Sequence, residues 1–527
     1  MEGSATNKHP LNISLDHFIS NFSQMGGEEE LRLFNKLQQE FTKQYELFFP
    51  DNLANKTIVV IPSLTLDQDV LQKVDGALHY EERMLCMLML LRMPRTHVVY
   101  VTSMPVDPVI VDYYLHLLPG ITGLHARERL NLLSCYDLSH SSLTEKILQR
   151  PRLIERIRKS IPDGHVAHLA CFNTTPLERT LAVCLNLPIY GCDPTLIYLG
   201  TKSGSRRVFM QAGLLMPPGS EDLESYDDIV HAVAGLKDMY PGLNKAVIKM
   251  NDGFSGDGNA VIHYPEGLNK LELFNWVHHN LSQEIKPIAK DMCFDKFMQK
   301  FCLMEGIVET FIEGGEEVTS PSVQCRINPL GDVDIISTHE QIMGGEDGQV
   351  FMGAQFPARA DYCAEIGALG KAVGEVLKEA GVIGRYGVDF ISVKNNNKWT
   401  HYALEINLRK GGTTHPFLML QFLTNGKYIS EKGIYLTPNG ERKYYFASDN
   451  LQKNIYKGLV PMDLIDIAML HGLHFDGFTQ QGVMFHMIGA LSQYGKLGLV
   501  CIGNSPEEAS GLFEKTVQVL DEEAMTL

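Results

Sequence analysis

Short apolar runs alternate with helical patterns in the first part of the chain. Three such runs, T-I-V-V-I-P (57–62), H-V-V-Y-V-T (97–102) and V-A-H-L-A-C-F (166–172), have the length expected of buried strands. A helical segment separates the first two. Another helix is expected after the third run, with Thr175 as N-cap and Pro176 in its first position. Strands that alternate with helices predict a parallel sheet.

The changes of pattern along the chain predict four parts. A polar and then helical N-terminal arm (1–56, with a helix over Glu28–Phe48) precedes the parallel α/β domain (57–200). Residues 201–418 hold glycine-rich turns and strand-like segments, and residues 419–527 form a C-terminal α+β extension. The chain is long enough for about three domains of ordinary size.

The segment E-I-N-L-R combines an extended pattern with clustered polar groups. Glu405, Asn407 and Arg409 recur at every second position, so a strand would place them on one face. Folding the chain back about Asn397 pairs Asp389 with Glu405, with β-carbons about 5 Å apart. Carboxylate and amide oxygens this close predict a site for Mg²⁺, with Mn²⁺ as an alternative. The other interpretation is a solvated hairpin with scattered charges.

A second feature is the glycine-rich segment A-V-I-K-M-N-D-G-F-S-G-D-G-N-A-V-I-H-Y (246–264). Two apolar runs flank Gly253, Gly256 and Gly258, and no Gly-Lys-Ser/Thr follows, so this is not a Walker A loop. A hairpin whose backbone N–H groups close over an anion fits better, and Lys249 lies where its ammonium could reach a phosphate. An ordinary flexible turn is the alternative.

The third feature is G-I-V-E-T-F-I-E-G-G-E-E-V (306–318). Strand residues lead to Glu309 and Ile312, and Gly314 and Gly315 then predict a bend before a further strand. Each of the three features has an ordinary explanation when taken alone. Their order along one chain is much harder to obtain by chance.

In this order, the three features resemble the ATP-grasp superfamily of carboxylate–amine ligases, and within it the pheganomycin-type peptide-ligase branch. The similarity covers about Lys202–Pro416. It implies an α/β (α+β ATP-grasp) fold class: an N-terminal parallel α/β domain, an ATP-grasp lid and catalytic sheet, and a C-terminal α+β extension. It also implies an ADP-forming enzyme that uses ATP and Mg²⁺ to join a small-molecule acid and an amine, such as amino acids or peptides, through an acyl-phosphate.

The resemblance assigns roles to individual residues. Lys202 and Lys249 would contact the nucleotide phosphates, Glu309 would face the adenine amino group, and either Glu316 or Glu317 would bind ribose. The full nucleotide-binding set that it implies is Lys202, Lys249, Gly253, Ser255, Gly256, Gly258, Glu309, Ile312, Glu316 and Glu317.

The metal and catalytic residues follow in the same way. Asp389, Glu405 and Asn407 would hold Mg²⁺, and Lys249 and Arg409 would stabilise the transferring phosphoryl group. Some members of the superfamily have a basic residue at the position of Gly387, so that role would fall to Arg385, Arg409 or another group.

Arg326 is a further catalytic candidate. It lies in the alternating run S-P-S-V-Q-C-R-I (320–327) and could clamp an anionic substrate. A surface salt bridge is the alternative. Among the histidines, His339 and His415 are candidates for contact with substrate or phosphate, and His486 is expected to be a core histidine.

Composition agrees with a large globular protein. The 527 residues are 44% hydrophobic and 21% charged, with a net charge of −17. The acidic balance argues against a nucleic-acid surface, which needs clustered Lys and Arg. The longest strongly apolar run, Met84–Leu91, is far shorter than a membrane-spanning helix.

The ten cysteines are spread singly, without a C-x-x-C pair. Most lie in apolar contexts, which predicts reduced cysteines in a cytoplasmic protein. The N-terminal segment lacks the profile of a signal peptide. A homodimer is one candidate assembly that the sequence leaves open.

Two other functions stay open beside the ligase. One is an ATP-binding, non-catalytic scaffold that acts through a protein partner, because a region of an animal protein with an IQ motif is similar to this family. The other is an ATP-grasp enzyme that forms a thioester. The complete set of Lys249, Asp389, Glu405, Asn407 and Arg409 favours the ligase, because a scaffold has no need of a full set of metal ligands.

Overall fold

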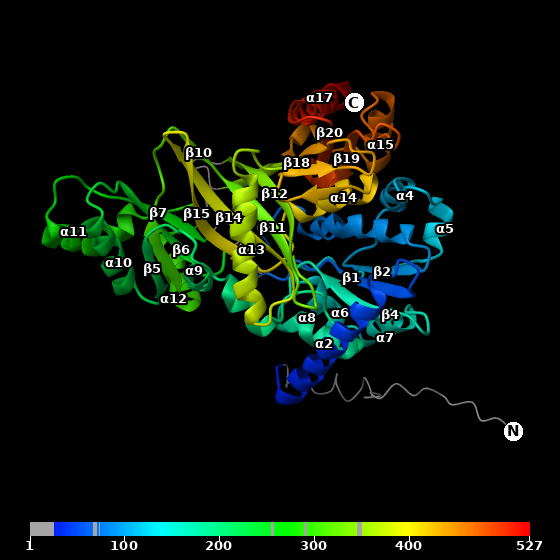
Figure 1. Cartoon of the computed structure of the whole chain (residues 1–527), viewed down its shortest axis with the longest axis horizontal. Coiled ribbons are helices and arrows are strands. Elements are labelled where there is room, and N and C mark those ends of the chain that lie inside the picture. Colours follow the sequence, from blue (N-terminus) through cyan, green and yellow to red (C-terminus); the bar gives the residue numbers. More distant parts are fainter. Residues whose placement is uncertain are drawn as a thin grey trace. The chain divides into compact units, whose positions relative to one another are not determined.

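The computed structural model of the chain divides into two compact units, Met1–Thr195 and Leu196–Leu527 (Figure 1). The residues that it describes are 26–66, 71–72, 74–253, 258–288, 292–344 and 350–526. Within the described residues, no helix is long and apolar enough to cross a membrane. The finer division into four parts stays a prediction.

The first unit is built on a parallel sheet with the strand order β3-β2-β1-β4, as the alternating pattern predicts. Its elements are α2 (Glu28–Phe48), β1 (Lys56–Ile61), the 3₁₀ helix η2 (Ala77–Arg92), β2 (Thr96–Thr102), α4 (Pro108–His116), α5 (Gly123–Arg127), β3 (Leu130–Ser134), α6 (Leu143–Leu148), α7 (Pro151–Lys159), β4 (Val166–Cys171) and α8 (Pro176–Leu185).

Two local predictions in this unit are confirmed. Helix α2 has the expected bounds, and Thr175 caps α8 with Pro176 in the first turn and Glu178 completing a capping box. Helix α2 is joined to α8 by the buried carboxylate of Glu30, which accepts a hydrogen bond of 2.8 Å from Arg179 Nε. Every residue of β1 is buried, as expected of a central parallel strand.

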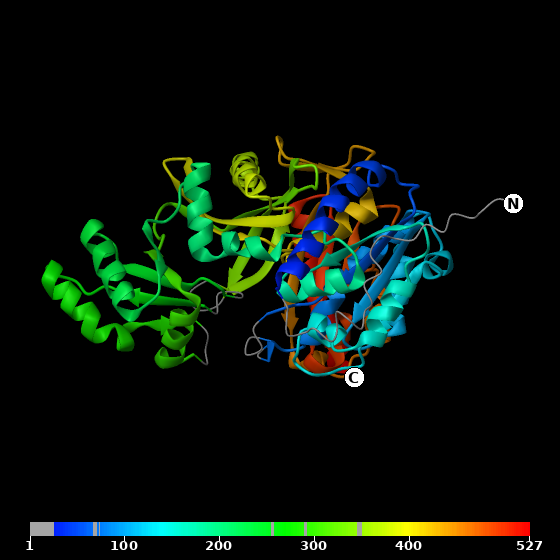
Figure 2. The ribbon, with the colours of Figure 1, turned by 90° about the horizontal axis from the view of Figure 1, so that it is seen from below.

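The second unit begins with a five-stranded sheet of order β5-β9-β6-β7-β8. Helices α10 and α11 contact each other beside this sheet, in the green segment of Figure 2. The elements of this part are η3 (Pro194–Gly200), α9 (Lys202–Ala212), β5 (Gly219–Leu223), α10 (Tyr226–Met239), β6 (Lys245–Met250), β7 (Asn259–His263), α11 (Lys270–Glu284), β8 (Lys286–Pro287), α12 (Phe294–Met304) and β9 (Gly306–Thr310).

A nine-stranded sheet follows, with the order β10-β14-β11-β12-β13-β18-β20-β19 and with β15 paired to β14. Its elements up to the candidate site are β10 (Glu317–Thr319), β11 (Pro321–Ile327), β12 (Val333–Gly344), β13 (Val350–Phe356), α13 (Cys363–Glu379), β14 (Gly384–Asn395), β15 (Lys398–Asn407) and α14 (Thr414–Thr424). Helix α13 packs on β11 and β12 through an apolar stripe (Figure 1).

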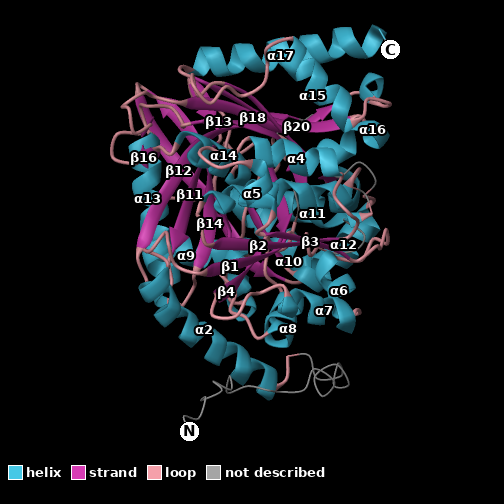
Figure 3. Cartoon of the chain, turned by 90° about the vertical axis from the view of Figure 1, so that its right-hand side faces the viewer, coloured by secondary structure: helices cyan, strands magenta, loops and turns pink. Residues whose placement is uncertain are grey.

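The C-terminal strands continue this same sheet, because β18 pairs with β13. Helix α17 packs on β18 and β20, and Figure 3 shows it running along the end of the sheet. The remaining elements are β16 (Lys427–Ile429), β17 (Ile434–Leu436), β18 (Tyr444–Gln452), η4 (Asn454–Tyr456), α15 (Pro461–Leu470), β19 (Gly482–His486), η5 (Ile488–Ala490), α16 (Leu491–Tyr494), β20 (Lys496–Gly503) and α17 (Pro506–Thr526).

Candidate functional site

The hairpin of β14 and β15 places Asp389 directly opposite Glu405, which confirms the predicted pairing. Its two-residue turn, Asn396 and Asn397, has positive φ at both positions (50° and 60°), the geometry that Asn tolerates in hairpins. This turn alone would not produce the pairing. A β-bulge between Asp389 and Phe390 shifts the register by one residue and brings the two carboxylates face to face.

Side-chain amides hold the carboxylate of Asp389 from two sides. Gln341 Nε2 donates to its Oδ1 at 2.8 Å, and Asn407 Nδ2 donates to its Oδ2 at 2.9 Å and reaches Glu405 Oε1 at 3.4 Å. Burial raises the pKa of Asp389, whereas Lys202 and these hydrogen bonds oppose the rise. The predicted metal residues Asp389, Glu405 and Asn407 therefore lie together around one small volume.

Gln341 is a site residue that the sequence analysis missed. It lies on β12, two positions after His339, so the alternation of that strand offered a weak signal. His339 itself is fully buried and its Nε2 lies 2.7 Å from the hydroxyl oxygen of Tyr445. Burial lowers the pKa of His339 to about 3, so it is a neutral core residue and not a group that faces substrate.

Lys202 joins this carboxylate group from the first turn of α9. Its ammonium forms an ion pair with Glu405. Asn251, at the end of β6, accepts a hydrogen bond of 2.9 Å from the backbone N–H of Ser203 and so ties the start of α9 to the glycine-rich hairpin. Burial and the nearby charge of Lys249 lower the pKa of Lys202 to about 7.

Lys249 lies on β6 and pairs with Glu309 on the adjacent strand β9. Its Nζ is 2.5 Å from Glu309 Oε1, and the side chains are 11% and 3% exposed. Arg206 reaches the other oxygen of Glu309 at 3.4 Å and also forms an ion pair with Glu221. The predicted phosphate lysine and the predicted adenine residue are thus direct neighbours.

The glycine-rich segment forms the predicted antiparallel hairpin of β6 and β7, with Lys249 opposite Asn259. Gly253 and Gly258 approach so closely that a β-carbon on Gly258 would lie 3.3 Å from the α-carbon of Gly253. This close approach of the two backbones favours glycine at position 258. Ser255 and Gly256 lie outside the described residues.

The bend predicted at Gly314 and Gly315 is present, with φ of 87° and 93°. Glu317 pairs with Arg359, whereas the exposed Glu316 accepts a hydrogen bond of 3.2 Å from the backbone N–H of Asn396. Ile312 lies between β9 and this bend, outside any strand.

The predicted catalytic arginines differ in their surroundings. Strand β15 ends at Asn407, so Arg409 lies beyond the strand and not on its face as expected. Its charge still acts on the site, because it opposes the rise in the pKa of Asp389. Arg326 donates to Asp334 Oδ2 at 2.7 Å across the β11–β12 pair, the arrangement of its salt-bridge alternative.

Gly387 has a structural reason to be glycine. It lies opposite Gln324, and a β-carbon there would be 2.6 Å from Gln324 Nε2. A basic side chain at this position would have to displace the side chain of Gln324.

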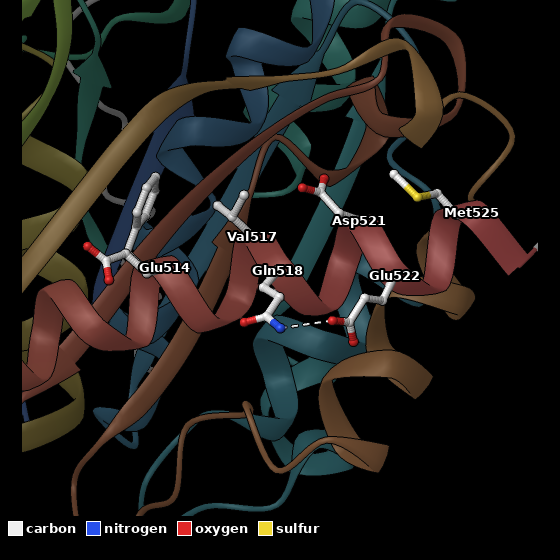
Figure 4. Close-up of a pocket in the computed structure, with 7 residues that line it drawn as sticks. Glu514, Val517, Gln518, Asp521, Glu522 and Met525 are labelled. Carbon is white, nitrogen blue, oxygen red and sulfur yellow. Dashed lines mark hydrogen bonds between the residues drawn. The ribbon is translucent and has the colours of Figure 1, made fainter.

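A groove of about 400 Å³ lies along α17 and is lined by Phe513, Glu514, Val517, Gln518, Asp521, Glu522 and Met525. Figure 4 shows these side chains along one helix. None of the predicted nucleotide or metal residues lines it, so it is not part of the candidate site.

Comparison with known proteins identifies ATP-grasp proteins as relatives of this chain. Residues 195–292 and 269–430 match the family model "IQCH-like, ATP-grasp", and residues 463–516 match "PGM1 C-terminal domain". The chain is 28% identical over 473 residues to an L-propargylglycine–L-glutamate ligase from Streptantibioticus cattleyicolor, covering 88% of this chain and 94% of that one. It is 21% identical to IQ motif-containing protein H of Danio rerio, over 89% of this chain and 49% of that protein.

Two solved structures share the fold. An ADP complex of N5-carboxyaminoimidazole ribonucleotide synthetase is 15% identical with a TM-score of 0.50, covering 89% of this chain and 98% of that one. Biotin carboxylase from Campylobacter jejuni is 13% identical with a TM-score of 0.50, covering 86% and 89%. These likenesses confirm the predicted fold class.

Proposed function

Because the chain belongs to the ATP-grasp superfamily, we propose that it is an ATP-dependent ligase that joins a small-molecule carboxylate to an amine and releases ADP and phosphate. The observation that carries this proposal is the ion pair of Lys202 with Glu405, which lies opposite Asp389, together with the charge of Lys249, which is near enough to lower the pKa of Lys202. Cations that can bind phosphate and oxygen ligands that can bind a metal ion are the two needs of phosphoryl transfer.

The donor set fits a hard divalent cation. Asp389 and Glu405 face each other, and Asn407 contacts both; a half-turn of its amide would present an oxygen in place of the nitrogen. These three residues would hold Mg²⁺, which neutralises phosphate charge when it is bound with the nucleotide. Gln341 holds the carboxylate of Asp389 in place through its hydrogen bond.

Different residues would bind the phosphates, the adenine and the ribose of the nucleotide. Lys202 and Lys249 would bind the phosphates under the hairpin of β6 and β7, and the backbone after Glu309 near Ile312 would meet the adenine. Glu316 is favoured over Glu317 for the ribose, because Glu317 is already paired with Arg359. Arg409 would stabilise the transferring phosphoryl group, since its charge already reaches Asp389.

In the proposed reaction, one carboxylate oxygen of the acid attacks the γ-phosphorus of ATP and ADP leaves. The amine then attacks the carbonyl carbon of the acyl-phosphate, and inorganic phosphate departs with that carboxylate oxygen. No nucleophile from the protein is needed, so its residues act by position and charge. The relative from Streptantibioticus cattleyicolor is named as a ligase of two amino acids, L-propargylglycine and L-glutamate. This supports amino acids and short peptides as the first substrates to try.

An oxygen-18 transfer experiment tests the mechanism. Pools of amino acids and peptides are first screened for ADP release, and products are identified by mass spectrometry. The active acid is then labelled with oxygen-18 in its carboxylate. Label is expected in inorganic phosphate, with ADP as the only nucleotide product. Label in AMP would overturn the mechanism. A thioester product would show that the enzyme forms a thioester and not an amide.

The scaffold is the second candidate, and the similarity to IQ motif-containing protein H of Danio rerio favours it. A scaffold would bind ATP but give neither labelled phosphate nor ADP above background with any acid and amine. That outcome over a broad substrate panel would decide for the scaffold.

The pKa of Lys202 leads to a prediction about nucleotide binding. Since this pKa is about 7, most of the free protein has a neutral Lys202 at a pH about one unit higher. A bound phosphate favours the charged ammonium, so binding of MgADP at that pH should take up about one proton. Calorimetry in buffers of different ionisation enthalpy measures this uptake. The proton uptake should be lost in Lys202→Arg, because arginine keeps its charge at this pH. Equal proton uptake in both proteins would contradict the assignment of Lys202 to the phosphates.

A further inference from the structure

A second polar cluster lies outside the candidate nucleotide and metal residues. It consists of His415 in the first turn of α14, Asp449 on β18 and His486 at the end of β19. All three residues are buried, and among the described residues they form the group of three potential metal ligands whose ligand atoms lie within 4.8 Å of one another. Nothing in the sequence connects the two histidines or singles out Asp449.

The three ligand atoms form a nearly equilateral triangle. His415 Nε2 is 3.1 Å and His486 Nε2 is 2.8 Å from Asp449 Oδ1, and the two nitrogens are 2.9 Å apart. Ligand atoms about 2.0 Å from a tetrahedral zinc ion would be about 3.3 Å apart, close to these distances.

Hydrogen bonds alone cannot account for all three contacts. Each imidazole Nε2 carries at most one proton, and the ionised carboxylate carries none. If both nitrogens donate to Asp449, their two N–H groups leave the short nitrogen–nitrogen contact repulsive. If only one nitrogen is protonated, its proton can serve one contact and the others lack a hydrogen. One cation bound to all three atoms makes every contact favourable.

The surroundings of the cluster agree with a cation. Asp449 is buried, and a buried carboxylate needs a compensating cation or hydrogen-bond donors. Among the described residues, Nδ1 of His486 has no hydrogen-bond partner. The polar contacts of this ring are therefore all made through Nε2, toward the cluster.

The backbone also leaves room beside the cluster. Gly498 on β20 lies directly opposite His486, and a β-carbon there would be 2.1 Å from His486 Nε2. Any side chain at this position would push the ring out of the triangle. A glycine is thus required where the ring nitrogen faces its two partners.

We propose that His415, Asp449 and His486 bind a divalent transition-metal ion, with zinc as the representative, at a site separate from Asp389 and Glu405. Two imidazoles and one carboxylate are a donor set that suits such ions, whereas Mg²⁺ prefers oxygen ligands throughout. The ion would link α14, which follows the loop carrying Arg409, to two strands of the C-terminal region. Bound metal should therefore stabilise the folded chain.

The test uses the full-length wild-type protein, stripped with EDTA and dialysed. Adding ZnCl₂ should raise its melting temperature by several degrees, and mass spectrometry of the metal content should find about one zinc ion per chain after gel filtration. MgCl₂ should not replace it. Stripped wild-type protein that neither retains zinc nor melts higher with ZnCl₂ would overturn the proposal, whatever the variants do.

Substitutions of single residues test which side chains bind the ion. Asp449→Asn and His486→Gln should each lose the bound zinc and the zinc-dependent shift in melting temperature. Gly498→Ala should do the same while leaving all three ligands chemically intact. His339→Gln is the matched control, because it removes another buried histidine of the same unit, and Asp389→Asn tests the other site; both should keep the zinc. Zinc retained by the cluster variants, or lost from the control, would overturn the assignment.

Discussion

Asp389→Asn and Glu405→Gln are each expected to lower the rate of ADP formation by about 10³-fold, because a metal ion contributes several kcal/mol to phosphoryl transfer and each 1.36 kcal/mol is tenfold in rate. Each substitution keeps the size of the side chain and removes one charge from a pair of facing carboxylates. The rate is measured by coupled ADP release at saturating substrate, with Mg²⁺ titrated. Rescue of part of the rate at high Mg²⁺ would be consistent with weakened metal binding.

The same variants should not unfold the protein. The pKa of Asp389 is raised above its ordinary value of 3.8, chiefly by burial. Ionised Asp389 therefore lowers the free energy of unfolding at pH values above 3.8. This loss of stability disappears as the pH falls through the raised pKa. Asp389→Asn should remove this cost at neutral pH, so its melting temperature should equal or slightly exceed that of the wild type without metal.

Asp222→Asn is the matched control for Asp389→Asn. Asp222 is exposed, pairs with Arg207 and has a φ of 57° that Asn also tolerates. Its activity should stay within about twofold of the wild type, because surface ion pairs contribute little. Full activity in both Asp389→Asn and Glu405→Gln would refute the metal site.

Lys249→Ala is expected to lower turnover by about 10²-fold or more and also to destabilise the protein. The ammonium would neutralise phosphate charge that develops in the transition state. In the protein it is also the close partner of Glu309, which is 3% exposed. Breaking a buried pair by removing one partner costs about 3–5 kcal/mol, because the other charge stays buried.

A double variant separates these two effects. In Lys249→Met with Glu309→Gln, no unpaired charge is buried, so stability should return toward the wild type while turnover stays low. Lys245→Ala, four residues earlier on the same strand and in a looser pair with Glu313 at 3.6 Å, should change neither property much. If the double variant regained turnover together with stability, Lys249 would have only a structural role.

Local features of this molecule could be predicted from the sequence because they depend on short stretches of chain. The helix Glu28–Phe48 and the Thr175 cap follow from periodicity and from the side chains at a helix start. The polar turn between two apolar strands predicts a hairpin that brings Asp389 close to Glu405. The bulge that completes this pairing was not foreseen, because nothing in the local pattern marks the extra residue.

Contacts between distant segments were decided only by the tertiary structure. Gln341 reaches Asp389, Lys202 pairs with Glu405, and Glu309 lies against Lys249. The order of strands in two sheets and the position of helix α9 bring them together. Residue type and spacing carry no record of that order.

The buried triangle of His415, Asp449 and His486 is the clearest case. Each residue alone fits an ordinary core or loop position, and the three come from a helix and two strands. The sequence by itself thus determined the local elements and predicted which residues would bind phosphate and metal. Only packing decided which of these side chains share a buried volume, because a charge or imidazole acquires its chemistry from neighbours that lie far away along the chain.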